Sequence, residues 1–274
     1  MNRPNYWGVA GYPISHSLTP RLFEIVGGKL GFDDVKAVFL EVGSAEEFVE
    51  RASELEGDLW ISCTSPLKRS VCKKLGIDVR GGLEAVNQVV RVNGDWSGSN
   101  TDGDGFVNAC RHIGLDPEGK TLEMKGGGST ARSVAMSWAV NGGKIVPVKG
   151  RRELVHGIWG DSFVGDSNVP DLSVDMDRSP GTPVESGEVG RNVVSVTYGE
   201  DPSADEFGVL MVAAQHLEAW KSLFTPDREG KFPHFRMYSR KSESHSGMFP
   251  CFFGGTHSLL FSSGFSALMS SLLV

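Results

Sequence analysis

The strongest constraint on the fold is a regular alternation of strand and helix patterns along the first part of the chain. Short apolar runs predict buried strands, and the amphipathic segments between them predict helices. In chain order these segments are 6–10, 19–32, 36–42, 44–55 and 58–66. Ser44 and Glu47 form the sequence pattern of a capping box at the start of the second helix. Such alternation predicts a mainly parallel sheet with helices on its faces.

A second alternating series begins near residue 120 and contains a glycine-rich turn. Its segments are a strand at 120–125, a glycine turn that opens a helix at 126–143, and a strand at 144–152. Later strands are expected at 171–176 and 192–198, and an amphipathic helix at 208–224. The sequence therefore predicts an α/β protein of two lobes, of which the second is Rossmann-like.

Composition restricts the class of protein. The 274 residues exceed the common single-domain size of about 100–200 residues, so two lobes or one large domain are expected. A net charge of -7, with 27 basic and 34 acidic residues, argues against a nucleic-acid groove. The four cysteines lack the spacing of a zinc site or a disulfide framework, which fits a reducing cytoplasm.

The two ends of the sequence bear on localisation. The N-terminal stretch contains Pro4 and Pro13 and no apolar run of signal-peptide length, so secretion is not expected. The stretch 249–274 contains no formally charged residue, but serines, glycines and His257 interrupt its apolar character. We expect a buried terminal helix or a poorly ordered tail there, not a membrane span.

An acidic stretch, GSNTDGDGF at 98–106, has two interpretations. It matches the first half of a calcium-binding loop, but Arg111 stands where that loop requires a bidentate glutamate, so no metal site is predicted. The other interpretation is that Asp102 is a catalytic carboxylate, which needs a partner from elsewhere in the chain. Asp104 is expected to be a solvent-facing loop residue before a helix that starts near Phe106.

The glycine turn GGGSTAR at 126–132 predicts a dinucleotide site. It follows a strand and opens a helix, where backbone N–H groups and the helix dipole can bind a pyrophosphate. The next strand ends in KGRR, so Arg151 and Arg152 gather positive charge where a 2′-phosphate would lie. The cofactor prediction is NADP. An ordinary strand-to-helix turn followed by a solvated basic turn is the alternative.

Lys68, in the stretch SCTSPLKRS, is the candidate partner of Asp102. A lysine beside a carboxylate keeps its ammonium form and can protonate an oxyanion that forms as hydride reaches a carbonyl. The residues alone leave this pairing open, because a lysine after a strand is most often a surface residue. His16 is expected to orient its loop and not to act as a base.

Seven short motifs occur in the order, and nearly at the spacings, of those in one enzyme family. They are GYPISHSLTP, CTSPLK, EAVNQVV, GSNTDGDGF, GGGSTAR, KGRR and LMVAAQHLEAW. In these motifs the chain resembles the shikimate dehydrogenases, from Gly11 to Arg152 and again from about Tyr198 to Trp220. The resemblance implies an N-terminal substrate domain at 1–103, completed by 208–274, and an NADP-binding Rossmann-like domain at 104–207 that is abbreviated after 154.

The resemblance also assigns roles to individual residues. It implies that Lys68 and Asp102 are the catalytic pair, that Ser17 and Thr19 bind the substrate carboxylate, and that Asp102 also contacts a ring hydroxyl. The remaining hydroxyl-binding residues would be Thr64, Asn87, Tyr198 and Gln215. The pyrophosphate would be lined by Gly126, Gly128, Ser129, Thr130 and Arg132, and the 2′-phosphate by Arg151 and Arg152. Short neutral side chains suit a polyol acid, because a buried hydroxyl without a partner costs about 1–3 kcal/mol.

Several departures from the family pattern bear on function. Ser62-Cys63-Thr64 replaces N-V-T, Glu84 replaces the glycine of G-A-V-N, and Ser129 replaces a glycine of the phosphate turn. The stretch 154–205 retains little of the family's nicotinamide-side motifs.

The predicted function is an NADP-dependent shikimate dehydrogenase that reduces 3-dehydroshikimate, as a monomer or homodimer in the cytoplasm, without a nucleic-acid or membrane partner. A quinate/shikimate dehydrogenase and a non-catalytic shikimate-binding paralogue are open alternatives.

Overall fold

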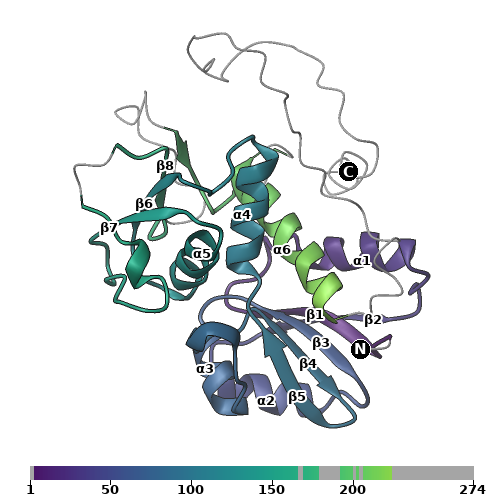
Figure 1. Cartoon of the computed structure of the whole chain (residues 1–274). Coiled ribbons are helices and arrows are strands. Elements are labelled where there is room, and N and C mark those ends of the chain that lie inside the picture. The colour runs from purple at the N-terminus through teal and green to yellow at the C-terminus, as the bar shows by residue number, and fades with distance from the viewer. Residues whose placement is uncertain (1–2, 166–168, 179–191, 200–201, 204–205, 224–274) are drawn as a thin grey trace.

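Two α/β lobes are joined by a pair of neighbouring helices, α4 and α6 (Figure 1). The computed structural model describes residues 3–165, 169–178, 192–199, 202–203 and 206–223. The elements of the first lobe and the joining helix are β1 (Tyr6–Gly11), α1 (Thr19–Lys29), β2 (Lys36–Glu41), α2 (Ala45–Ser53), β3 (Leu59–Cys63), α3 (Leu67–Leu75), a 3₁₀ turn (Arg80–Gly82), β4 (Gln88–Val92), β5 (Asp95–Ser99) and α4 (Asp102–His112). They are followed by β6 (Thr121–Lys125), α5 (Ser129–Val140), β7 (Lys144–Val148), a 3₁₀ turn (Gly160–Ser162), β8 (Leu172–Asp175), β9 (Val193–Val194) and α6 (Phe207–Leu223). The predicted α/β class with two sheets is confirmed.

The first sheet has the strand order β2-β1-β3-β4-β5 and is mixed. β1 pairs parallel with β2 and β3, as the strand and helix alternation predicts. β4 and β5 instead form an antiparallel hairpin, and β4 pairs antiparallel with β3. The hairpin turn is Asn93-Gly94, whose φ angles of 51° and 90° are both positive, as a two-residue type I′ turn requires. The sheet is therefore less parallel than the sequence led us to expect.

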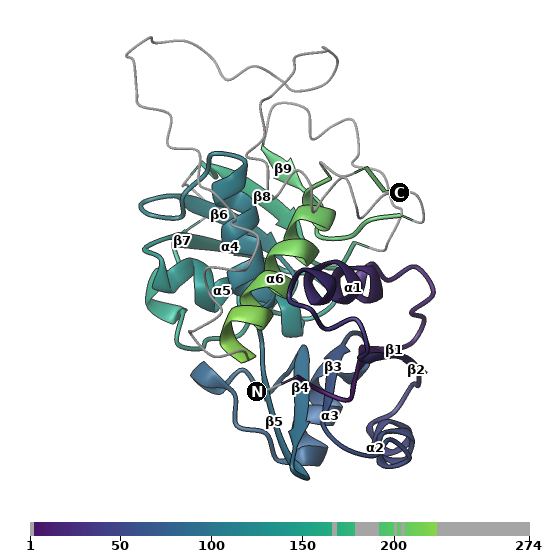
Figure 2. The same ribbon diagram turned by 90° about the vertical axis from the view of Figure 1, so that its right-hand side faces the viewer.

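Helices α1 and α6 lie beside the first sheet (Figure 2), and aromatic side chains pack between them and the sheet. Phe23 of α1 and Trp220 of α6 each lie 4.7 Å from the Trp60 ring of β3, centroid to centroid. All three side chains are fully buried. A large apolar side chain contributes about 1.5–3 kcal/mol when it is fully buried, so this cluster holds both helices on the sheet. The segment that ends at Trp220 thereby returns to the first lobe.

Two glycines in the acidic stretch allow α4 to pack closely between α5 and α6. A Cβ at Gly103 would lie 2.0 Å from the Ser133 carbonyl oxygen of α5, and a Cβ at Gly105 would lie 2.5 Å from the Gln215 Cβ of α6. The stretch is thus the first turn of a helix that begins at Asp102, and the expectation of a loop with a helix start near Phe106 was wrong. Glycine is a poor helix former, but here close packing requires it.

The second sheet has the order β7-β6-β8-β9 and is parallel throughout. The β6, α5 and β7 elements form the predicted strand, helix and strand unit after a glycine turn. Trp138 on α5 is fully buried, and its indole N–H donates to the Lys144 carbonyl oxygen at 3.1 Å. This parallel arrangement is consistent with the Rossmann-like lobe that the sequence predicts.

Two smaller expectations can be compared with the structure. Ser44 Oγ accepts from Glu47 N at 3.2 Å, as a capping box requires, but Glu47 Oε2 accepts from Gly43 N and not from Ser44 N. Within the described ranges, no helix has both the length and the apolar character needed to cross a membrane. The uncharged stretch 249–274 lies outside those ranges.

Candidate active site

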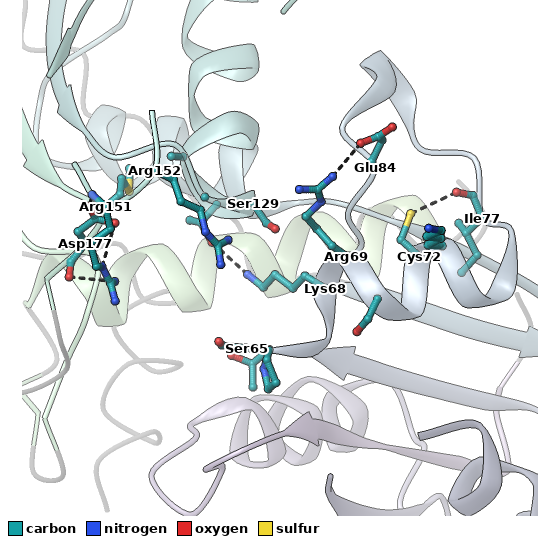
Figure 3. A pocket seen from close by; sticks show the side chains of 18 of the residues that line it. Ser65, Lys68, Arg69, Cys72, Ile77, Glu84, Ser129, Arg151, Arg152 and Asp177 are labelled. Atoms are coloured by element: carbon teal, nitrogen blue, oxygen red, sulfur yellow. Dashed lines mark hydrogen bonds and ion pairs between the residues drawn. The ribbon is translucent and has the colours of Figure 1, made fainter. Parts of the chain in front are cut away.

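A cleft of about 1160 Å³ lies between the two lobes. On one side it is lined by residues that follow β3 and by the first turns of α3, including Thr64 and Lys68. On the other side it is lined by the β6–α5 turn, the start of α5 and the residues that follow β7 and β8. Figure 3 shows Lys68 extending from α3 toward the wall that carries Ser129 and Arg152, whereas Arg69 points toward Glu84. The cleft therefore brings the predicted catalytic and cofactor segments face to face.

Lys68 and Asp102 form a close ion pair beside this cleft. Lys68 Nζ lies 2.5 Å from Asp102 Oδ2. The carboxylate is 1% exposed, whereas the lysine side chain is 17% exposed and lines the cleft. Because α3 and α4 each begin at this point, residues 34 positions apart in sequence meet here. The lysine end of the pair is the part that a bound molecule can reach.

Asn87 holds the carboxylate from behind. Its Nδ2 donates to Asp102 Oδ1 at 2.8 Å, and its Oδ1 accepts from Thr101 N at 2.9 Å. Asp102 N in turn donates to Asn100 Oδ1 at 3.1 Å. Buried polar networks in which each member has a partner are rigid, so the carboxylate has a fixed orientation. Asp102 faces Lys68. Asp104, by contrast, is an exposed residue, and its Oδ1 accepts a hydrogen bond from Ser137 Oγ at 2.8 Å.

Thr130, from the second lobe, completes the arrangement around the pair. Its Oγ1 donates to Asp102 Oδ2 at 3.0 Å and accepts from Lys68 Nζ at 3.2 Å. The sequence assigned Thr130 only to the pyrophosphate turn, and its contact with the ion pair was missed. A hydroxyl where the family motif has alanine was the available signal. Thr130 thus links the glycine turn directly to the ion pair.

The glycine turn presents an uncapped helix end to the cleft. α5 begins at Ser129, and its N-cap Gly128 supplies no side-chain cap for the first backbone N–H groups. Gly128, Ser129 and Thr130 all line the cleft, and a Cβ built at Gly128 would meet nothing within 4 Å. Free N–H groups and the helix dipole favour an anion at this position. The turn therefore fits the pyrophosphate of a dinucleotide.

The two arginines that follow β7 also line the cleft, and Arg151 is paired with Asp177. Arg151 N donates to Asp177 Oδ2 at 2.5 Å, and its Nε lies 3.5 Å from Asp177 Oδ1. Arg151 is exposed, whereas Asp177 is largely covered. Figure 3 shows this pair at the far end of the cleft from Lys68. Asp177, which follows β8, was not among the predicted site residues.

Other predicted residues lie outside the lining of this cleft. Ser17 Oγ accepts from Thr19 N at 3.3 Å, and Leu18 N donates to the Tyr198 hydroxyl at 3.4 Å, so these segments meet at the start of α1. Burial raises the pKa of Tyr198, which keeps its hydroxyl protonated. The His16 ring contacts the Tyr198 ring at 6.4 Å. Gln215 packs against Gly105, and neither Gly126 nor Arg132 lines the cleft itself.

Cys63 lies at the end of β3 near the ion pair. Burial raises the pKa of this thiol to about 12, although the nearby Lys68 charge opposes the effect. The sulfur is therefore a neutral, buried group at physiological pH, and it adds no negative charge beside Lys68.

Comparison with known proteins finds relatives of one kind. None of the protein-family models scanned matches the chain. The NADP(+)-dependent shikimate dehydrogenase of Alkaliphilus metalliredigens is 35% identical over 147 residues, which is 53% of this chain and 51% of that protein. Over about half of its length the chain is therefore similar in sequence to the shikimate dehydrogenase family. It spans about half the length of the curated family members it matches.

Solved structures support the fold of this family. A shikimate 5-dehydrogenase from Thermus thermophilus, solved in complex with shikimate, superimposes with a TM-score of 0.64 at 23% identity, covering 82% of this chain and 95% of that one. A 5-ketofructose reductase from a Gluconobacter strain gives a TM-score of 0.54 at 18% identity, covering 79% and 91% of the two chains. Likeness at this level of identity shows the fold, and the second match shows that the fold alone does not identify the substrate.

Proposed function

We propose that this protein is an NADP-dependent shikimate dehydrogenase, which reversibly reduces 3-dehydroshikimate to shikimate in aromatic amino acid (chorismate) biosynthesis. The observation that carries the proposal is the 2.5 Å contact between Lys68 Nζ and Asp102 Oδ2. This pair lies opposite an uncapped helix end with the chemistry of a dinucleotide site. A cationic acid and a hydride carrier on facing walls are what carbonyl reduction requires.

Lys68 supplies the proton in the proposed reaction. The nicotinamide cofactor, when bound, supplies hydride to the carbonyl carbon. As negative charge develops on the carbonyl oxygen, the Lys68 ammonium donates a hydrogen bond to it and then transfers its proton, leaving a hydroxyl group. In the oxidative direction the neutral amine accepts that proton. Asp102 keeps the ammonium in position, and its buried carboxylate stabilises the charged form of the lysine.

The polar side chains around the pair suit the substrate class. We assign the ring hydroxyls on the Lys68 side to Thr64, which lines the cleft, and to Asn87, which is hydrogen-bonded to Asp102. We assign the substrate carboxylate to Ser17 and Thr19, and further hydroxyl contacts to Tyr198 and Gln215. A substrate that brings its own hydroxyls leaves fewer of these groups without a partner, which selects against less hydroxylated analogues.

The cofactor assignment rests on the second lobe. Gly126, Gly128, Ser129, Thr130 and Arg132 form or adjoin the turn at the start of α5, where the pyrophosphate would be held. Arg151 and Arg152 line the cleft beyond that turn and supply positive charge for a 2′-phosphate.

The test is an absorbance assay at 340 nm with the purified chain, either shikimate or quinate, and either NADP or NAD. We expect NADP reduction with shikimate, and Lys68→Met is expected to be inactive. Higher turnover of quinate would reassign the substrate. If calorimetry detects shikimate binding but no combination of acid and cofactor gives turnover, the protein is a shikimate-binding protein and not an enzyme.

A further inference from the structure

The carboxylate of Asp177 lies in a niche formed by two glycines. A Cβ at Gly150 would lie 2.2 Å from Asp177 Oδ2, and a Cβ at Gly126 would lie 3.0 Å from Asp177 Oδ1. Asp177 N donates to Asp175 Oδ1 at 2.9 Å, which fixes the turn after β8. The carboxylate is therefore held between the ends of β6 and β7, directly beside the glycine turn.

This position coincides with the adenosine end of the candidate dinucleotide site. In a Rossmann-like lobe the pyrophosphate lies at the helix end, and the adjoining ribose lies over the end of the following strand. Here those elements are α5 and β7, and Asp177 lines the same cleft as Ser129 and Arg151. A carboxylate accepts hydrogen bonds from ribose hydroxyls, whereas it repels a phosphate on the same ring.

Asp177 also forms an ion pair with Arg151, one of the two arginines assigned to the 2′-phosphate. It accepts from the Arg151 backbone N–H at 2.5 Å, and the Arg151 Nη2 donates to the Asp177 carbonyl oxygen at 3.2 Å. The Arg151 side chain is 76% exposed, so it can exchange partners at little cost. A 2′-phosphate would have to compete with a carboxylate that is already in place.

We propose that Asp177 is a specificity-determining residue that limits the preference for the phosphorylated cofactor and admits NAD as well as NADP. This inference rests on the proposed function, because it concerns the same dinucleotide site. Asp177 favours the ribose 2′-hydroxyl, Arg151 and Arg152 favour the 2′-phosphate, and their opposition leaves the two cofactors with affinities within about tenfold of each other.

The experiment is calorimetric titration of the full chain with ADP-ribose and with 2′-phospho-ADP-ribose, which requires no turnover. Asp177→Asn keeps the shape and an oxygen acceptor for Arg151 N but removes the charge. We expect it, and Asp177→Ser, to raise the affinity for 2′-phospho-ADP-ribose relative to ADP-ribose by about tenfold or more. Asp171→Asn, which removes one charge from the Lys120 pair at the start of β8, is the matched control and should leave the ratio unchanged.

The outcomes separate the inference from the proposed function. If Asp177→Asn and Asp177→Ser bind both fragments in the wild-type ratio, Asp177 only orders its turn, and the inference is overturned while the dinucleotide site stands. If the wild-type chain binds neither fragment, the dinucleotide site itself is wrong, and both the proposed function and the inference are lost.

Discussion

Two ion pairs along the cleft, Lys68 with Asp102 and Arg151 with Asp177, differ in how they are held. In the first pair, Asp102 is 1% exposed and has hydrogen bonds from Asn87, Thr130 and Lys68. In the second pair, the side chain of Asp177 is 14% exposed and its partner Arg151 is 76% exposed. The first pair is built into the protein interior, whereas the second has a partner that solvent surrounds.

This difference indicates that the two pairs suit different tasks. A buried pair that is hydrogen-bonded on several sides keeps one geometry, which proton transfer requires. An exposed arginine loses little when it changes partner, which suits a site that distinguishes ligands by charge.

Asp102→Asn should have the largest effect because it breaks the buried pair. It leaves the Lys68 ammonium without its counter-charge and removes the group that orients it, so kcat/KM for shikimate should fall by about 10²–10⁴-fold. Steady-state assays at 340 nm measure this change. Asp104→Asn is the matched control in the same helical turn, and its contact is with Ser137. Equal losses in both variants would show that the turn, not the pair, matters.

Acid should weaken the aromatic core between the first sheet and α6. His216 of α6 is fully buried, its ring lies 4.9 Å from that of Phe23, and neither ring nitrogen has a hydrogen-bond partner within the described residues. Burial lowers its pKa to about 3, so between pH 6.5 and pH 3 the unfolded chain binds a proton that the folded chain does not. Stability is thus fully present above pH 6.5 and falls as pH decreases.

From pH 6.5 to pH 5 the loss attributable to His216 should be about 2 kcal/mol of unfolding free energy. Urea unfolding of the wild type and of His216→Leu at several pH values measures it. As pH falls, the free energy of unfolding of the wild type should decrease more than that of His216→Leu. Parallel pH profiles would mean that His216 is protonated equally in both states.

Thr130→Val tests the link between the glycine turn and the Lys68–Asp102 pair. Losing the hydroxyl that contacts Lys68 and Asp102 should lower kcat/KM about tenfold, with most of the change in kcat. Thr130→Ser keeps the hydroxyl and should recover most of the activity. If Ser and Val behave alike, the hydroxyl is dispensable and only the packing of the turn matters.

Glu84→Gly should have the smallest effect. Glu84 has a φ of 50°, in the left-handed region that favours glycine, and pairs with Arg69 at 3.0 Å on the exposed rim of the cleft. Glycine adopts this backbone conformation without the cost of about 1 kcal/mol that glutamate incurs. Glycine also makes the unfolded chain more flexible and removes the surface ion pair, and these two losses offset the gain. The free energy of unfolding, measured by thermal denaturation, should change by less than about 1 kcal/mol. The kcat should not change. A large loss of activity would place Glu84 in the substrate site.

Much of the fold could be predicted from sequence periodicity, because each strand and helix in the two alternating series has a distinct apolar pattern. The β4–β5 hairpin was missed although Asn93-Gly94 is a strong local turn signal. The start of α4 was also missed, since glycines that read as a loop serve close packing against Ser133 and Gln215. In that case tertiary contact outweighed local propensity.

The candidate site was predictable only in part. The partnership of Lys68 with Asp102 came from family resemblance, because spacing along the chain cannot bring two helix starts together. Thr130 and Asp177 reach the site through the packing of one lobe on the other and of β8 beside β6. Asp177 has no local sequence pattern, and the hydroxyl of Thr130 does not by itself indicate its partners, so the structure was needed to find both contacts.

The central claim is that Lys68 and Asp102 act as one proton-transfer unit, and a double-mutant cycle tests it most directly. We would measure kcat for shikimate oxidation by the wild type, Lys68→Met, Asp102→Asn and the double variant. If the two residues form a unit, the double variant should be no slower than Lys68→Met alone. If the losses in the single variants multiply in the double variant, the two residues act independently and the account is wrong.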